Sequence, residues 1–121
     1  MSTLCAPLKV LLIFPPADNQ GAVLKEAGRR LGCSTSSAVD LDSAMDAYLA
    51  QRHNVVVIDA RKNNKAFDHF AVCRAIRSTN FGHEAVVVAL IGKSSETSPV
   101  HYLLRNGYSR VSLSRSIQPA S

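Results

Sequence analysis

The stretch Val55-Val56-Val57-Ile58-Asp59 decides the fold that this sequence predicts. Four β-branched apolar residues in succession favour a central strand buried on both faces of a sheet. The run ends in a carboxylate, and open parallel sheets bind their ligands beside the carboxyl ends of their strands. Asp59 is therefore the first candidate for a functional residue.

Strands and helices alternate on both sides of this central strand. Apolar runs predict strands at 9–14 and 85–91, and weaker β patterns predict strands at 33–39 and 108–113. Apolar residues at helical spacing predict one helix that ends before Gly32, one that begins after Asp40 or Asp42, and two more within 67–80 and 97–106. This alternation indicates an α/β fold with right-handed crossovers and helices on both faces of a parallel sheet.

The alternation predicts one domain at 9–113, between an N-terminal segment, 1–8, and a C-terminal tail, 114–121. The tail is short and polar, so we expect the fifth helix to be short or missing. Hydrophobic residues make up 46% of the chain, a globular proportion, and no apolar run is long enough for a bilayer. We therefore expect no membrane contact.

The charge pattern and the cysteines bear on partners and location. The net charge is +5, but the arginines are scattered over several elements, which favours a solvated surface over a nucleic-acid interface. Three cysteines without paired spacing argue against disulfides and zinc and predict a reducing, cytoplasmic compartment. Cys73 lies on an apolar stripe and is expected to be an inert core thiol. The four histidines are expected at the surface rather than as metal ligands: His53, His69, His83 and His101.

The order of elements, with an acid closing the third strand, resembles the receiver domain of two-component response regulators. That resemblance covers 9–113 and implies a flavodoxin-like sheet of five parallel strands in the order 2-1-3-4-5. Asp59 matches the phosphoacceptor. A phosphorylated receiver also needs an acidic pair after its first strand, because these carboxylates help to hold the Mg²⁺ that neutralises the phosphoryl group. Here Phe14-Pro15 stands in that place.

Two further receiver features are missing, a hydroxyl residue that ends the fourth strand and a lysine that ends the fifth. The sequence has Leu90-Ile91-Gly92 and Ser112-Leu113-Ser114 at these ends, with Lys93 and Ser94 close by. Asp59 therefore resembles a vestigial phosphoacceptor, and the neighbours expected around it are Asp18, Arg61, Lys93 and Ser94.

Short strings of the sequence show a closer resemblance. Val10-Leu11-Leu12-Ile13-Phe14, Ile58-Asp59-Ala60-Arg61 and Cys73-Arg74-Ala75-Ile76-Arg77-Ser78 resemble the receiver-like domain of the high-affinity cAMP-specific cyclic nucleotide phosphodiesterases, family eight. In that family the domain precedes a PAS domain and a distant catalytic domain. The resemblance implies a non-catalytic regulatory module of a cAMP phosphodiesterase, with no catalytic residue in this chain.

Asp59 and its neighbours allow more than one interpretation. A lone strand-end carboxylate is readily satisfied by Arg61, Lys62 or a neighbouring backbone amide, and Arg61 could instead guide an anionic ligand. Pro15-Pro16 could turn the chain so that Asp18 approaches Asp59, which would restore a weak Mg²⁺ site. Otherwise we expect no cofactor or metal. The alternative function is a phosphorylatable receiver that uses Asp59 in a phosphorelay.

The partners expected by analogy with receivers are proteins. They are the PAS or catalytic domain of the same parent chain, a separate protein, or a second copy in a homodimer. Nucleic-acid binding driven by charge is a third reading, and it predicts an affinity that falls steeply with salt. The expected contact surface follows the fourth helix and the fifth strand and includes His101, Tyr102, Arg105 and Tyr108.

Overall fold

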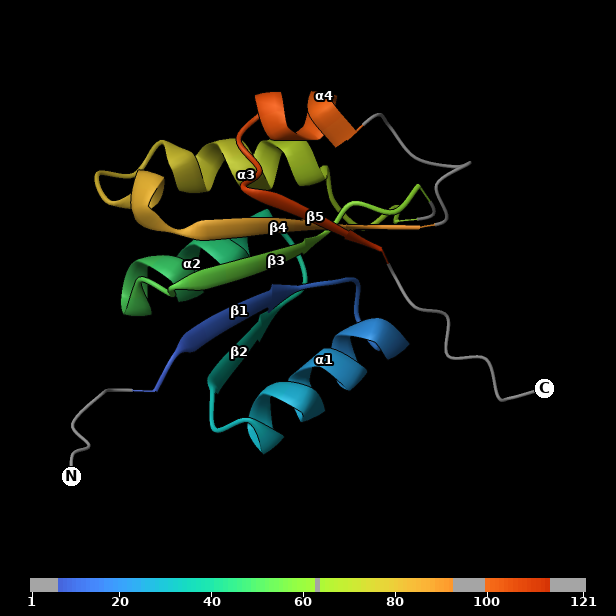
Figure 1. The fold of residues 1–121 in the computed structure, drawn as a ribbon, viewed down its shortest axis with the longest axis vertical. Helices are drawn as coiled ribbons and strands as arrows, with labels where there is room; N and C mark the ends of the chain where they lie inside the picture. Colours follow the sequence, from blue (N-terminus) through green and yellow to red (C-terminus); the bar gives the residue numbers. More distant parts are fainter. Residues whose placement is uncertain (1–6, 63, 93–99, 114–121) are drawn as a thin grey trace.

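A computed structural model describes residues 7–62, 64–92 and 100–113, and all structural statements refer to these residues. Five parallel strands form one sheet in the order β2-β1-β3-β4-β5, as the sequence predicts (Figure 1). The strands are β1 (Lys9–Ile13), β2 (Ser34–Ala38), β3 (Val55–Asp59), β4 (Val86–Ile91) and β5 (Arg110–Leu113). The weakest prediction, the serine-rich β2, is confirmed.

The register of the sheet aligns the carboxyl ends of its central strands. Ile13 of β1 lies beside Ile58 of β3, and Asp59 lies beside Leu90 of β4. The segments that follow β1, β3 and β4 therefore start at the same edge. Asp59 lies at this edge, next to the point where the chain leaves β1 on one side and β4 on the other.

Aspartate side chains cap the first three α-helices of the chain. They are α1 (Asn19–Arg30), α2 (Leu41–Gln51), α3 (His69–Arg77) and α4 (Val100–Arg105), and a short 3-10 helix, η1 (Gly82–Glu84), precedes β4. Asp18, Asp40 and Asp68 each stand just before a helix and accept hydrogen bonds from its first backbone amides. These three aspartates therefore fix where α1, α2 and α3 start.

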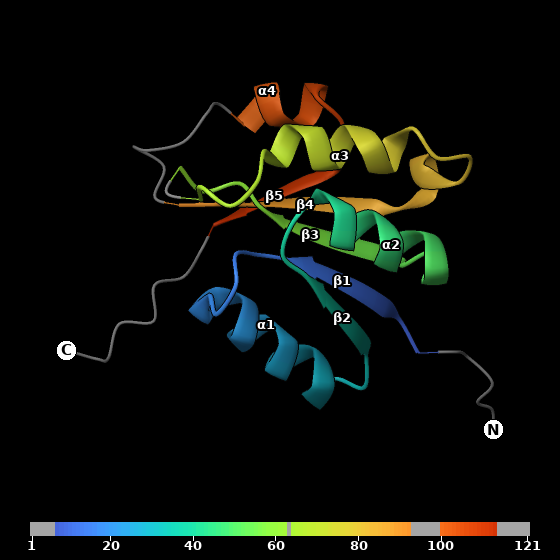
Figure 2. The same cartoon turned by 180° about the vertical axis from the view of Figure 1, so that it is seen from behind.

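The helices divide unequally between the two faces of the sheet. Figure 2 shows α2, α3 and α4 on one side and α1 on the other. The larger core lies under the three helices and includes Leu11, Ile58 and Val87, and the smaller one, Leu12, Phe14 and Leu90, lies on the face of α1. The expectation of a short or missing fifth helix concerns 114–121, which lie outside the described residues.

Burial corrects two predictions about polar residues. His53 is 2% exposed, and His69 is partly buried, so the prediction that all four histidines lie at the surface is wrong. Arg77, expected on a solvated surface, is partly buried and donates hydrogen bonds to backbone oxygens. Within the described ranges no helix combines the length and apolar character that crossing a bilayer requires.

Candidate functional site

Asp59 is the last residue of β3, and its side chain is fully buried. Both of its carboxylate oxygens accept hydrogen bonds from Arg61, two residues further along the chain. Oδ1 accepts from Nε of Arg61 at 2.7 Å and from the Arg61 backbone N–H at 3.1 Å, and Oδ2 accepts from Nη2 at 3.0 Å. The buried charge of Asp59 is thus compensated by a local, two-pronged ion pair.

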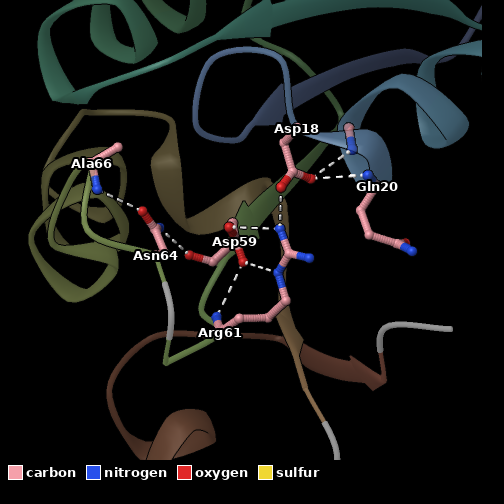
Figure 3. Close-up of polar contacts among 7 residues, drawn as sticks. Asp18, Gln20, Asp59, Arg61, Asn64 and Ala66 are labelled. Atoms are coloured by element: carbon pink, nitrogen blue, oxygen red, sulfur yellow. Dashed lines mark hydrogen bonds and ion pairs between the residues drawn. The ribbon is translucent and has the colours of Figure 1, made fainter. Parts of the chain in front are cut away.

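Asp18 reaches the same guanidinium from the loop that follows β1. This loop contains Pro15-Pro16 and turns back at Ala17, whose φ of 60° is unusual for a residue with a Cβ. Oδ1 of Asp18 accepts from Nη2 of Arg61 at 2.7 Å, while Oδ2 caps α1 by accepting from the amides of Gln20 and Gly21 (Figure 3). Asp18 therefore caps α1 and also forms an ion pair with Arg61.

The guanidinium of Arg61 lies between the two acids. The side chain is 16% exposed, and the hydrogen bond to Asp59, followed by that to Asp18, raises the pKa of Arg61, so its charge is permanent. The predicted ion pair of Arg61 with Asp59 is present, and Asp18 does approach Asp59. What joins the two carboxylates is an arginine, whereas in a phosphorylated receiver the acids share a metal ion.

Asn64 is a site residue that the sequence analysis missed. Its Nδ2 donates to the backbone oxygen of Asp59 at 2.8 Å, and its Oδ1 accepts from the Ala66 N–H at 2.9 Å. A signal existed, because asparagine in a polar loop commonly bonds the nearby backbone in this way. Lys93 and Ser94, the other expected neighbours of Asp59, lie outside the described residues.

Only some of the residues predicted for the partner surface are exposed. His101, Tyr102 and Arg105 are exposed on α4, but Tyr108 is 3% exposed, so its assignment to that surface is wrong. The Tyr108 hydroxyl donates to the backbone oxygen of His69 at 3.0 Å and lies 2.8 Å from Nδ1 of the same residue. Because the hydroxyl proton goes to the carbonyl, Nδ1–H of His69 donates to the hydroxyl oxygen.

Replacing Tyr108 by phenylalanine is expected to lower the free energy of unfolding by about 1–2 kcal/mol, since it removes both hydrogen bonds and leaves His69 without its partner. Urea denaturation measures the effect. The matched control is Tyr102→Phe, which removes the hydroxyl of an exposed tyrosine on the neighbouring helix. Equal stability of the two variants would contradict the role given to the Tyr108 hydroxyl.

The burial of His53 and the partial burial of His69 make stability depend on pH. Burial lowers the pKa of His53 and of His69 below the ordinary value of 6.5. The unfolded chain therefore binds protons first, and stability is fully present above about pH 6.5 and is lost as the pH falls below it. Thermal unfolding midpoints measured across this range should show the loss. His69→Asn, which keeps a donor near the Nδ1 position, should flatten the profile; an unchanged profile would exclude His69 as a cause.

Cys73 has the character that the sequence predicted. It is fully buried, and burial raises the pKa of its thiol to about 11. A thiol in this state is a poor nucleophile because little thiolate forms near neutral pH. Within the part of the chain that the structure describes, no three histidine, cysteine or acidic residues are placed to hold a metal ion.

Comparison with known proteins connects the chain to a family. The family model described as "PDE8A-like, N-terminal domain" matches residues 1–117. The human high affinity cAMP-specific and IBMX-insensitive 3',5'-cyclic phosphodiesterase 8A is 30% identical over 84 residues, which cover 69% of this chain and 10% of that enzyme. The chain thus spans about a tenth of the length of this relative.

Solved structures that resemble the chain include receiver domains of response regulators. A CheY-like response regulator receiver domain from Methylobacillus flagellatus superimposes with a TM-score of 0.72 at 17% identity and covers 96% of this chain and 92% of its own. The chemotaxis response regulator CheY4 of Vibrio cholerae gives 0.73 at 18% identity, with 88% and 85% covered. At these identities the similarity shows the fold. With a receiver fold and a family model that spans nearly its whole length, the chain belongs to the family of PDE8A-like N-terminal domains.

Proposed function

We propose that this domain is a non-catalytic regulatory or protein-interaction module of a cAMP-specific phosphodiesterase, and that it works without phosphorylation of Asp59. The supporting observation is the arginine that occupies the space between Asp59 and Asp18. The hydrolytic site of the parent enzyme lies, in this proposal, outside these 121 residues. The cytoplasm is the proposed location.

Phosphorylation of Asp59 would be opposed by its surroundings. Both carboxylate oxygens are engaged by Arg61, and the side chain is fully buried. An incoming phosphodonor would have to displace the guanidinium before either oxygen could attack, and Mg²⁺ would have to compete with a fixed positive charge. The permanently charged Arg61 therefore keeps Asp59 ion-paired and unphosphorylated.

The second candidate is a phosphorylatable receiver that uses Asp59. It is favoured by one observation, the position of Asp59 at the carboxyl end of β3 with Asp18 beside it. Beryllofluoride with Mg²⁺ mimics an aspartyl phosphate, and amide NMR reports whether it binds. We expect the spectrum of the natural chain to stay unchanged. Localised shifts around Asp18 and Asp59 would support the phosphorylated receiver and contradict our proposal.

The proposed contact surface is the exposed side of α4. Val100, Tyr102 and Leu104 are 48%, 49% and 43% exposed, and His101 and Arg105 add polar groups between them. Val100 and Leu104 lie one turn apart on the same side of α4, and exposed apolar side chains are common at protein contacts. We propose that they meet the PAS or catalytic domain of the parent enzyme, a separate protein, or a second copy of the chain.

A binding experiment tests this surface, with the domain and the rest of the parent enzyme supplied as two separate proteins. Leu104→Asp should weaken binding of the domain to it, and sedimentation of the domain alone shows whether copies associate. Leu31→Asp, which changes an exposed leucine at the end of α1, is the control. Equal binding by both variants would remove α4 from the proposal.

A further inference from the structure

One edge of the sheet carries backbone groups without partners. The strand at this edge, β2, pairs with β1 and has no second neighbour among the described strands (Figure 1). The N–H of Ser34 and the oxygen of Ala38 form hydrogen bonds with backbone groups at the two ends of β1. Alternate residues of a strand direct these groups to opposite edges. Thr35 and Ser37 therefore direct their N–H and carbonyl groups outward, where no described residue meets them.

The side chains of β2 do not protect this edge. The strand reads Ser-Thr-Ser-Ser-Ala, without a charge or a proline, and its register with β1 is continuous, without a bulge. Charged residues, prolines and bulges are what usually keeps an edge strand from pairing with another chain. The strand at the other edge, β5, begins with the exposed Arg110. The edge at β2 is therefore the one open to a further strand.

A second copy of β2 fits this edge in one register. With a two-fold axis at Ser36, Thr35 of one copy lies opposite Ser37 of the other. Antiparallel residues in such a pair exchange two hydrogen bonds, each residue donating its N–H and accepting on its oxygen. The two symmetric pairs give four hydrogen bonds and use every outward group of Thr35 and Ser37.

The charges at the two ends of β2 favour the antiparallel direction. Arg29 and Arg30 lie near its amino end and share one carboxylate, that of Glu26, so positive charge is left over. Asp40 and Asp42 lie just beyond its carboxyl end. Antiparallel pairing places the arginines of one copy beside the aspartates of the other, whereas parallel pairing would place like charges together.

Exposed apolar side chains flank the same edge. Leu31, before β2, is 80% exposed, and Val39, after it, is 40% exposed. In the register centred on Ser36, Val39 lies opposite Cys33 of the second copy and close to Leu31 of that copy. Association would therefore cover apolar surface at both ends of the paired strands.

The helices leave room for this pairing. Both α1 and α2 contact β1 as well as β2, so each helix lies over the seam between these two strands. Two copies of α1 would then lie about 10 Å apart across the new seam, close to the separation of packed helices. We propose that the chain forms a symmetric dimer through β2, in which the two sheets join into one. This contact is separate from the surface on α4.

Disulfide trapping tests the register. Residues that face each other in a non-hydrogen-bonded antiparallel pair have Cα atoms about 4.5 Å apart, within the range of a disulfide. Ser36→Cys should therefore cross-link two copies when oxidised glutathione is the oxidant, in a background with Cys5 and Cys33 replaced by serine. Ser34→Cys is the matched control, because its two copies would lie about 13 Å apart. Equal cross-linking of the two variants would contradict the register.

Sedimentation equilibrium of the 121-residue chain tests the hydrogen bonds. Ser37→Pro removes an N–H that has no partner among the described residues, so the fold should persist, as circular dichroism can verify. The variant should weaken association at least about tenfold, since each dimer loses two hydrogen bonds. Ser37→Ala keeps the backbone N–H and should associate like the natural chain.

Charge reversal tests the ends of the strand without changing its backbone. Arg30→Glu should weaken association, and Arg30→Glu combined with Asp42→Lys should restore it. Leu104→Asp, on α4, should leave association unchanged. The proposal is overturned if the natural chain stays monomeric at millimolar concentration, if the charge-reversed pair associates no better than Arg30→Glu alone, or if Leu104→Asp abolishes association.

Discussion

Replacing Arg61 by alanine is expected to lower the free energy of unfolding by about 3–5 kcal/mol, the range found when one partner of a buried ion pair is removed. Asp59 would keep its buried charge and lose the hydrogen bonds from Nε at 2.7 Å and Nη2 at 3.0 Å, while the bond from the backbone N–H of residue 61 would remain. Asp18 would still cap α1 but would lose its link to β3. Denaturation by urea, followed by circular dichroism, measures the loss.

A double-mutant cycle separates the loss of the ion pair from other destabilising effects of the Arg61→Ala substitution. Asp59→Asn combined with Arg61→Ala leaves no buried charge at Asp59, so the double variant should be more stable than Arg61→Ala alone. Arg105→Ala, on the exposed side of α4, is the control for loss of an arginine. If Arg61→Ala unfolds no more easily than this control, the guanidinium does not compensate Asp59 as described.

The Arg61→Ala variant also tests whether Asp18 and Asp59 can bind Mg²⁺ once the arginine is removed. Without the guanidinium, the carboxylates of Asp18 and Asp59 face each other uncompensated, and Mg²⁺ should raise the stability of the variant by binding its folded state. The natural chain should show no such gain, because its arginine already supplies the positive charge. A comparison at matched ionic strength with sodium chloride distinguishes specific binding from screening.

The sequence was sufficient for the parts of this site that depend on local pattern. The apolar run of β3 predicts a central strand, and its last residue, Asp59, must then lie at the carboxyl edge. Because Arg61 lies two residues after Asp59, its side chain can reach Asp59 and form an ion pair without help from another element. These inferences require only the period of a strand and the reach of an arginine side chain, and both are confirmed.

From the sequence, the approach of Asp18 to Asp59 could be stated only as one of several alternatives. It lies 43 residues from Arg61, and its approach depends on the turn at Ala17, whose positive φ no residue preference would suggest. Burial of His53 and Arg77 was mispredicted for a related reason. Both residues follow or end helices in polar surroundings. Arg77 is covered because the loop before β5 and η1 supply its acceptors, and His53 is covered because it stacks on Tyr48 of α2 and lies beside Ser36 of β2.

Replacing Arg77 by alanine is the other change expected to have a large effect. We expect the free energy of unfolding to fall by about 3 kcal/mol. Hydrogen bonds from a charged donor are each worth about 1.5–3 kcal/mol, and hydration of the partly exposed acceptors offsets some of the loss. Four donors of its guanidinium are engaged at 2.7–2.8 Å. The acceptors are the backbone oxygens of Gly107, Gly82 and Ala85 and the hydroxyl of Ser109.

These contacts join the end of α3 to the nearby η1 and to the loop before β5, which is about 30 residues further along the chain. Arg77 ends α3, Gly82 begins η1 and Ala85 follows it. Ser109 precedes β5 and accepts from the Val87 N–H of β4 at 3.1 Å. Loss of the guanidinium should therefore loosen the start of β4 and β5 before it affects β1. Amide hydrogen exchange should accelerate at 82–87 and 107–109 beyond the change seen elsewhere.

Arg74→Ala is the matched control for Arg77, because Arg74 lies one turn earlier on α3 and is exposed. Arg77→Lys tests geometry apart from charge: a lysine ammonium cannot span four acceptors arranged around a planar fork, so this variant should recover less than half of the lost stability. If lysine restores the natural stability, charge alone accounts for Arg77. If Arg74→Ala is equally damaging, the four contacts are not what stabilises this end of the sheet, and the order in which β4 and β5 open must have another cause.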